Sequence, residues 1–340
     1  KETIVQDSFM IVDSDTISMD RVDELFGHKP DTVIFVNDTI YRWINDTITT
    51  DLSPIYEMLR QLTSITEVNV SGNKSITNLD PLSELSDLRI LNCSGTNVSD
   101  LTPIRNLNGI KELDISNTNV TDISKLKYAN IVQIFKADNN KIDDVSIVEY
   151  FKELNYLSMS NTEVSDISSL SGCDNLKTLN LSGTLVNDLT PLSKSFQLHD
   201  LDVSNTYIGD LSPLQELGNL NFLSVEGSQV TDISKIAVLK ELNEINFSNT
   251  KVADLEALNN MPKLSVIYCD NSLVTREKAD RFREQNPDKL IINESEALRM
   301  WWNELPSFWK SLLAEQTNTN MVPSKEELHS IINVRSLKLT

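Results

Sequence analysis

The 340-residue sequence contains no apolar run that approaches the length of about 18 residues needed for a membrane-spanning helix. Basic residues are also in short supply, since 30 lysines and arginines stand against 50 aspartates and glutamates and leave a net charge of -20. A chain with this balance repels phosphate backbones and anionic lipid headgroups. The sequence therefore predicts no membrane insertion and no nucleic-acid partner.

Histidine and the usual catalytic motifs are scarce as well. The three histidines, His28, His199 and His329, lack metal-ligand spacing. The sequence has no glycine-rich phosphate loop, no nucleophile elbow and no zinc motif. We therefore expect a protein that is not an enzyme and that uses no cofactor and no metal.

What the sequence does contain is a 22-residue repeat that runs without interruption from Leu85 to Met261. Each repeat follows the pattern L-x-x-L-x-x-L-x-[apolar]-S-[G/N]-T-x-[V/I]-x-D-[L/I]-[S/T]-P-[L/I]-x-x-L. A fixed period of this length is the signature of a solenoid, in which each repeat adds one unit to a stack. Because solenoids usually work by presenting a surface, binding is the expected kind of function.

Each repeat is predicted to hold a short strand followed by a turn. In the repeat that begins at Leu85, residues Leu91, Asn92 and Cys93 alternate between core and surface, as a strand does. Two residues after the strand comes a position that holds only glycine or asparagine, which most readily accept a left-handed backbone. The residues at this position are Gly72, Gly95, Asn117, Asn139, Asn161, Gly183, Asn205, Gly227, Asn249 and Asn271. We expect the same turn in all ten repeats.

Short polar side chains follow that turn, and we expect them to bond backbone groups that the turn leaves unpaired. They are Thr96, Thr118, Asn140, Thr162, Thr184, Thr206, Ser228 and Thr250. The second half of each repeat is predicted to form a short helical turn. Thr102 is the expected N-cap of one such turn, with Pro103 in its first position.

An aspartate precedes the helical turn in eight successive repeats. These residues are Asp100, Asp122, Asp144, Asp166, Asp188, Asp210, Asp232 and Asp254. Stacked carboxylates would suit calcium, or each would accept a backbone N–H bond at the start of the helical turn. Because a binding site is local whereas this aspartate recurs throughout, we expect the structural role.

The three cysteines occupy predicted core positions. Cys93 and Cys269 stand at the same strand position eight repeats apart, which places them about 38 Å from each other at the usual strand spacing. A disulfide needs Cα atoms within about 7 Å. Together with Cys173, they are predicted to be buried thiols without a bridge.

A strand and a short helical turn within 22 residues make a leucine-rich repeat, and the sequence resembles the bacterial internalin-type repeats. Their D-[I/L]-S-P-L segment stands at Asp210–Leu214 and their L-x-x-L-x-x-L-x-L segment at Leu217–Val225. One departure is that the asparagine ladder of the family is mostly threonine here. The resemblance implies an α/β repeat solenoid, a leucine-rich-repeat right-handed superhelix with short parallel strands on the concave face and helical turns on the convex face. It also implies a bacterial protein at the cell surface or outside the cell, with its signal peptide removed; a cytoplasmic location is the alternative.

Four regions are predicted along the chain. They are an N-terminal cap at 1–61, the array of about ten repeats at 62–274, a C-terminal cap helix and strand at 275–293, and a Trp-rich helical module at 294–340. The last region resembles a module of leucine-rich-repeat proteins from gut Bacteroidetes. Ser324 and Glu327 have capping-box spacing, and Val334–Leu339 imitates a repeat strand. That final stretch either begins a second array or folds back as part of the cap.

The candidate binding surface is where the repeats differ, on the strand positions that face outward. The predicted partner-binding residues are Ile90, Glu112, Asp114, Ile134, Lys136, Tyr156, Asp200, Asp202, Phe222, Glu226, Glu244 and Tyr268. Aromatic side chains tend to anchor interfaces, and the carboxylates favour a basic or amphipathic partner. We therefore expect a monomer that binds a protein or peptide. The alternatives are a structural spacer in a longer surface protein and an intracellular regulator that holds an enzyme.

Overall fold

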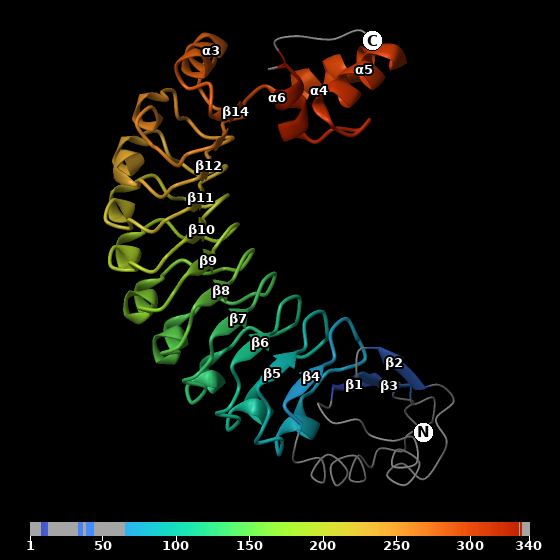
Figure 1. The fold of residues 1–340 in the computed structure, drawn as a ribbon. Coiled ribbons are helices and arrows are strands. Elements are labelled where there is room, and N and C mark those ends of the chain that lie inside the picture. The colour runs from blue at the N-terminus through green and yellow to red at the C-terminus, as the bar shows by residue number, and fades with distance from the viewer. Residues whose placement is uncertain (1–7, 13–32, 37–38, 44–64, 333, 335–340) are drawn as a thin grey trace. The chain divides into compact units, whose positions relative to one another are not determined.

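The structure, a computed structural model, describes residues 8–12, 33–36, 39–43, 65–332 and 334. The chain divides into two compact units, residues 1–186 and residues 187–340. Each unit contains a stack of repeats, with strands on one side and short helical turns on the other (Figure 1). Most of the predicted N-terminal cap lies outside the described residues, so the boundary at residue 61 stays a prediction.

Three antiparallel strands precede the repeats of the first unit: β1 (Ser8–Val12), β2 (Val33–Val36) and β3 (Thr39–Trp43). Strand β3 pairs with both β1 and β2. Strand β1 also pairs antiparallel with the first repeat strand, β4 (Glu67–Asn69). The N-terminal segment therefore supplies backbone partners for the outer edge of the first repeat.

The repeats of the first unit continue with parallel strands in regular register. The strands are β5 (Ile90–Asn92), β6 (Glu112–Asp114), β7 (Ile134–Lys136), β8 (Tyr156–Ser158) and β9 (Thr178–Asn180). Residues 22 positions apart face each other, for example Leu91 and Leu113. The turns opposite the strands are the 3₁₀-helices η1 (Asp80–Leu82), η2 (Thr102–Ile104), η3 (Ser124–Leu126), η4 (Ser146–Tyr150) and η5 (Ser168–Gly172).

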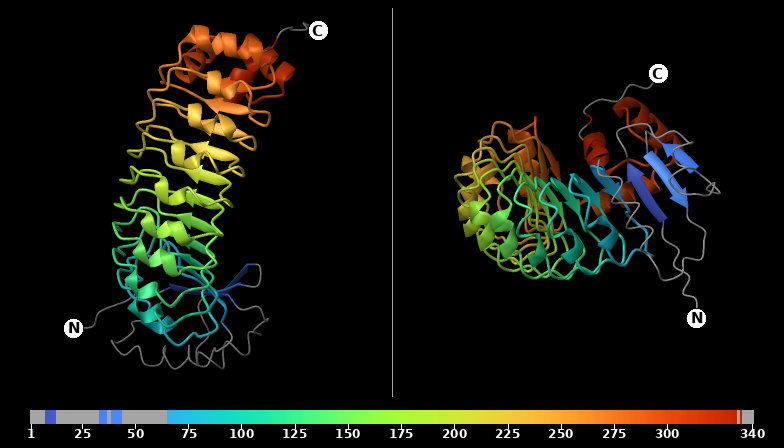
Figure 2. Two further views of the ribbon diagram at one scale, coloured as in Figure 1. Left: turned by 90° about the vertical axis from the view of Figure 1, so that its left-hand side faces the viewer. Right: turned by 90° about the horizontal axis from the view of Figure 1, so that it is seen from below.

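The second unit repeats the same arrangement (Figure 2). Its strands are β10 (Asp200–Asp202), β11 (Phe222–Ser224), β12 (Glu244–Asn246), β13 (Val266–Tyr268) and β14 (Leu290–Ile292), all parallel to their neighbours. Its 3₁₀-helices are η6 (Thr190–Leu192), η7 (Ser212–Leu214), η8 (Ser234–Val238) and η9 (Glu256–Leu258). Helix α3 (Arg276–Gln285) precedes β14, and Thr275 caps it as an N-cap residue. The helix and strand predicted for 275–293 are thus both present.

The core of both units is built from the repeated apolar positions. The middle residue of every repeat strand is buried, and so are the leading leucines of four repeats, Leu85, Leu107, Leu217 and Leu239. Burying a leucine side chain contributes about 1.5–3 kcal/mol, and the same contribution recurs in each repeat. The prediction of three buried free thiols is confirmed. Burial raises the pKa of Cys93 and of Cys269 to about 12, so both thiols stay protonated and unreactive.

The predicted turn is present in all ten repeats, and every glycine or asparagine at that position has a positive φ. The amide of the turn residue donates to the next repeat: the N–H of Asn117 lies 2.7 Å from the carbonyl of Asp138. The short polar side chain that follows closes the turn. The hydroxyl of Thr96 donates to the carbonyl of Cys93 at 2.7 Å, and that of Thr184 to Leu181 at 2.6 Å.

The recurrent aspartate caps the helical turns, as predicted. In all eight cases its Oδ1 accepts the N–H of the residue two positions on, at 2.7–2.8 Å. The prediction that Thr102 acts as the N-cap acceptor is wrong, because Asp100 accepts the N–H of Thr102 itself. In the equivalent position, the hydroxyl of Ser212 donates to the aspartate before it at 2.5 Å. The hydroxyl thus donates a hydrogen bond to the capping carboxylate and is not itself the capping acceptor.

Three helices complete the second unit: α4 (Ser295–Glu304), α5 (Ser307–Thr317) and α6 (Lys325–Ile332). They enclose a small core of their own, whose buried residues are Trp302, Leu313, Ala314, Leu328 and Ile331. The predicted capping box is present. The N–H of Ser324 donates to the Glu327 carboxylate at 2.7 Å, and the N–H of Glu327 donates to the Ser324 hydroxyl at 3.2 Å.

Helix α6 packs against β14 through a buried histidine. Nε2 of His329 lies 2.7 Å from the carbonyl oxygen of Asn293, and Nδ1 lies 2.6 Å from the carbonyl oxygen of Lys325. The backbone just after β14 is therefore bonded by a side chain of α6. Most of the repeat-like stretch Val334–Leu339 lies outside the described residues, and its role stays a prediction.

Substitution of the left-handed residue tests the turn. We expect Asn117→Ala to lower the free energy of unfolding by about 1 kcal/mol, because alanine pays a steric cost at positive φ that glycine does not. The matched control is Asn117→Gly, which we expect to stay within a few tenths of a kcal/mol of the parent. Urea unfolding measures both variants, and equal losses for alanine and glycine would contradict this account of the turn.

Acid should destabilise the protein through the aspartate row. Asp144 and Asp232 each accept hydrogen bonds from the serine two positions on. The bond from the backbone N–H, followed by the bond from the serine hydroxyl, holds the pKa of each carboxylate below its ordinary value. The unfolded chain then binds more protons than the native chain, so the stability contributed by these bonds is complete above about pH 5 and declines as the pH falls below about 4.

A matched pair isolates this effect. Asparagine at position 144 keeps the acceptor oxygen but removes the titration, so the melting temperature of Asp144→Asn should fall less steeply below pH 4 than that of the parent. The neighbouring Asp143 lies outside the row, and Asp143→Asn should leave the slope closer to that of the parent. If the two variants have the same pH profile, the row does not cause the acid sensitivity.

Candidate functional site

The outward side of the repeat strands, here called the sheet face, carries the predicted binding residues of each unit. Every repeat strand buries its second residue and keeps its first half-exposed on this face. The third residue is half-exposed as well, except in β8, β11 and β14, where it is buried. In the first unit the sheet face holds the half-buried side chains of Ile90, Glu112, Asp114, Ile134, Lys136 and Tyr156. In the second unit it holds those of Asp200, Asp202, Phe222, Glu244 and Tyr268.

Several third-position side chains have a structural task. Oδ1 of Asp114 accepts the N–H of Ser116 at 2.9 Å. Oδ1 of Asp202 likewise accepts both the N–H of Ser204, at 2.9 Å, and its hydroxyl, at 2.6 Å. These carboxylates shape the turn that follows the strand, as asparagine does at the same position in other repeats. The D-x-S spacing is a local signal of this role that the sequence prediction did not use.

Glu226 also bonds to its own protein. Its two carboxylate oxygens accept amide N–H groups of the next repeat, from Asn246 at 2.8 Å and from Asn249 at 2.9 Å. The residue follows β11 directly after the buried Val225, and its carboxylate joins two neighbouring repeats. Its negative charge remains on the surface, but its position is fixed by these bonds.

The first-position residues differ from these. Ile90, Ile134 and Tyr156 in the first unit, and Phe222 in the second, are apolar or aromatic side chains that stay half-buried on the sheet face. Parallel pairing places Asp200, Phe222 and Glu244 side by side on β10, β11 and β12. The surface therefore alternates between a carboxylate, an aromatic ring and a second carboxylate.

Two of the three sheet-face rings already carry an ammonium group of the same chain. The Nζ of Lys136 lies 5.4 Å from the centre of the Tyr156 ring, and the Nζ of Lys325 lies 4.5 Å from the centre of the Tyr268 ring. Both are cation–π contacts. Within the described part of the chain, no such cation lies on the ring of Phe222.

Helix α6 brings two residues to the sheet face that sequence analysis did not predict. The carboxylate of Glu326 lies near the Tyr268 hydroxyl, and Lys325 covers the ring of the same tyrosine. Burial, followed by the charges of Glu244 and Glu326, raises the pKa of Tyr268 to about 12. Burial and then Glu326 also raise the pKa of Glu244. Helix α6 thus bounds the sheet face at β13.

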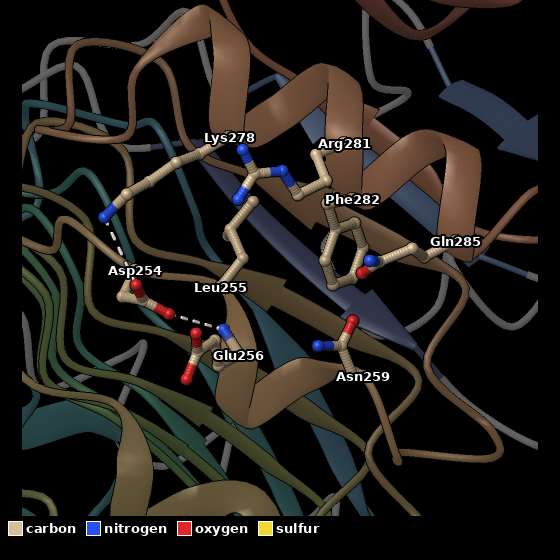
Figure 3. Close-up of a pocket in the computed structure, with 8 residues that line it drawn as sticks. All are labelled: Asp254, Leu255, Glu256, Asn259, Lys278, Arg281, Phe282 and Gln285. Carbon is tan, nitrogen blue, oxygen red and sulfur yellow. Dashed lines mark hydrogen bonds and ion pairs between the residues drawn. The ribbon is translucent and has the colours of Figure 1, made fainter.

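A separate cavity of about 450 Å³ lies between η9 and α3, away from the strands (Figure 3). Three of its charged side chains are already paired: Asp254 lies 3.2 Å from the Nζ of Lys278 and accepts the N–H of Glu256 at 2.7 Å, and Arg281 lies 3.1 Å from the carboxylate of Glu277. Phe282 and Leu255 form its buried floor. The cavity therefore has the features of a packing cleft between a repeat and its cap helix.

The described residues include no group of three or more histidine, cysteine, aspartate or glutamate side chains placed to hold a metal ion. None of their helices has the length and apolar character needed to cross a membrane.

Known proteins share the repeat and the fold. Residues 152–194 match the family described as leucine-rich repeats in two copies. No curated protein matches the chain in sequence. The structure is similar to that of an internalin, InlF, of Listeria monocytogenes, with a TM-score of 0.57 and 23% sequence identity over 72% of this chain and 82% of that one. It is also similar to internalin C2 of Listeria monocytogenes, with a TM-score of 0.54 and 26% identity over 61% of this chain and 88% of that one.

A third similar structure is the plant peptide hormone receptor RGFR1 in complex with RGF2, with a TM-score of 0.53 and 15% identity over 69% of this chain and 44% of the receptor. At that identity the likeness concerns the fold alone. The repeat match, the 22-residue period and the similar structures agree with one another. The chain is built from leucine-rich repeats, and its solenoid fold is similar to that of the internalins.

Proposed function

We propose that this protein is a non-catalytic binding protein that holds a protein or peptide on its sheet face. Proteins with leucine-rich repeats generally bind other proteins, and the similar structures include internalins and a peptide receptor. RGFR1 is described in complex with RGF2, which gives an example of a related fold that holds a partner. The likeness to internalins also supports a bacterial protein that is exported to the cell surface or beyond.

The observation that carries this proposal is the contrast between the two outward strand positions. At the third position, side chains such as Asp114 and Asp202 form bonds within their own turn. At the first position, Tyr156 and Phe222 present aromatic surface whose chemistry the repeat does not require. Large rigid rings on a protein surface are typical anchors of protein interfaces.

The charge of the sheet face supports a basic or amphipathic partner. Carboxylates at positions 112, 200 and 244 share the first position with the aromatic rings. Oppositely charged surfaces accelerate association and lose part of their attraction as salt is added. We therefore propose that binding weakens as the ionic strength rises.

A pull-down with two triple variants tests the proposal. The baits are the parent chain, a sheet-face variant (Tyr156→Ala, Phe222→Ala and Glu112→Gln) and a turn-side variant, whose three residues all lie outside the repeat strands (Tyr128→Ala, Tyr150→Ala and Tyr207→Ala). The turn-side tyrosines are about half exposed, at 53%, 47% and 54%, so this control removes a similar amount of aromatic surface. We expect the sheet-face variant to lose at least tenfold in affinity for a captured partner, since interface aromatics each contribute about 1–2 kcal/mol or more.

Circular dichroism melting first confirms that both variants fold. A partner that the turn-side variant loses and the sheet-face variant keeps would contradict the proposal. Capture of no partner from surface or secreted fractions would favour the alternative of a structural spacer.

A further inference from the structure

We propose that the row formed by Asp200, Phe222 and Glu244 recognises the guanidinium group of an arginine on the partner. This inference rests on the proposed binding function of the sheet face and names the chemistry that one part of it selects. The three residues lie on the adjacent strands β10, β11 and β12 of the second unit. Parallel register sets them directly beside one another.

The geometry of the row suits a planar cation. Neighbouring strands lie about 4.8 Å apart, so a group seated on the Phe222 ring lies within reach of carboxylates on both sides. A guanidinium stacks on an aromatic face through its plane and donates hydrogen bonds from its edges. Each edge would then meet one carboxylate, which forms a charge-assisted hydrogen bond. An ammonium group has no plane to stack and reaches both carboxylates less readily.

The other sheet-face rings provide an independent reason to expect a cation here. Tyr156 carries the ammonium of Lys136 at 5.4 Å, and Tyr268 carries that of Lys325 at 4.5 Å. Phe222 is the remaining ring of the three, and among the described residues no cation lies on it. Two carboxylates flank it instead. Two of the rings thus form cation–π contacts with lysines of the same chain, and the third ring can accept a cation from a partner.

The surroundings of Glu244 agree with this assignment. Glu244 is half-buried, and its pKa is raised by burial and by the nearby Glu326, with Lys325 acting in the opposite direction. A cation placed on the row would stabilise the ionised carboxylate. Binding would therefore relieve an unfavourable charge arrangement as well as create new contacts.

Short peptides test the row without a macromolecular partner. The probe is acetyl-Gly-Arg-Gly-amide, and its competitors carry lysine or citrulline at the central position. Citrulline keeps the planar shape of arginine and removes its charge. Chemical shifts of the Phe222 amide and ring, followed by NMR during titration of the intact protein, should show saturable binding of the arginine peptide. We expect the lysine peptide to bind several-fold more weakly and the citrulline peptide to bind at least tenfold more weakly.

Substitutions then assign the contacts. Phe222→Leu keeps an apolar side chain but removes the ring, and it should weaken arginine binding about threefold, as expected for a partly exposed cation–π contact. The double variant Asp200→Asn and Glu244→Gln should weaken it about tenfold. The matched control is Glu216→Gln, which removes a carboxylate from an exposed residue after η7 in the second unit, outside the repeat strands, and should leave the affinity unchanged.

Equal binding of the arginine and citrulline peptides, or unchanged affinity in Phe222→Leu, would overturn the assignment. The outcome is separable from that of the pull-down. If a macromolecule binds the sheet face but the arginine peptide does not bind, the assignment of the row to arginine is wrong and the proposed function still stands. An arginine peptide that binds while no macromolecule is captured would support the row and count against the wider function.

Discussion

A single backbone turn, repeated ten times, determines how the repeats stack. The turn residue adopts a left-handed conformation that only glycine and asparagine accept at little cost, and its N–H donates to a carbonyl of the following repeat. The bond measures 2.7 Å from Asn117 to Asp138 and 2.6 Å from Asn205 to Glu226. Because donor and acceptor are both backbone groups, the spacing of repeats does not depend on the side chains at the surface. The remaining features of the repeat follow from this fixed spacing.

This spacing separates the residues that the fold needs from those that it does not. Inward positions are confined to apolar side chains by close packing, and the third strand position often shapes the next turn. Neither requirement applies to the first strand position, which holds isoleucine, glutamate, tyrosine, threonine, aspartate, phenylalanine or valine in the different repeats. Variation there costs little stability, which is the condition under which a surface can be adapted to a partner. The contrast between the two outward positions therefore indicates that the first position is the one available for contact with a partner.

Most of the local structure could be predicted from the sequence, because its causes lie within one repeat or one helix terminus. The left-handed turns, the aspartate caps, strand β14 and the capping box at Ser324 all have local signals. The role assigned to Thr102 was wrong because two acceptors, a hydroxyl and a carboxylate, lie within two residues, and the charged group forms the stronger bond.

The contacts of α6 with the sheet face could not be predicted, because they join residues that lie far apart in sequence. Nothing in the segment around Lys325 and Glu326 indicates that it reaches Tyr268, 57 residues earlier. The same holds for His329, whose bond to Asn293 depends on how α6 packs on β14. The bonds that hold Glu226 also come from the next repeat. In each case the pattern within a repeat identifies the surface position but does not reveal its neighbour.

The acidic balance of the chain has different consequences on the two sides of the repeats. On the turn side, hydrogen bonds from the residue two positions on hold the pKa of the recurrent aspartates low in most repeats. The side-chain hydroxyl is the larger cause at Asp100 and Asp188, and the backbone N–H is the larger cause at Asp144. On the sheet face, burial and a neighbouring carboxylate raise the pKa of Glu244 instead. Carboxylates on the turn side therefore contribute to folding, whereas Glu244 keeps an electrostatic cost in the free protein. A cationic partner relieves that cost only when it lies on the sheet face, so the charge of this chain favours binding at the strands over binding at the turns.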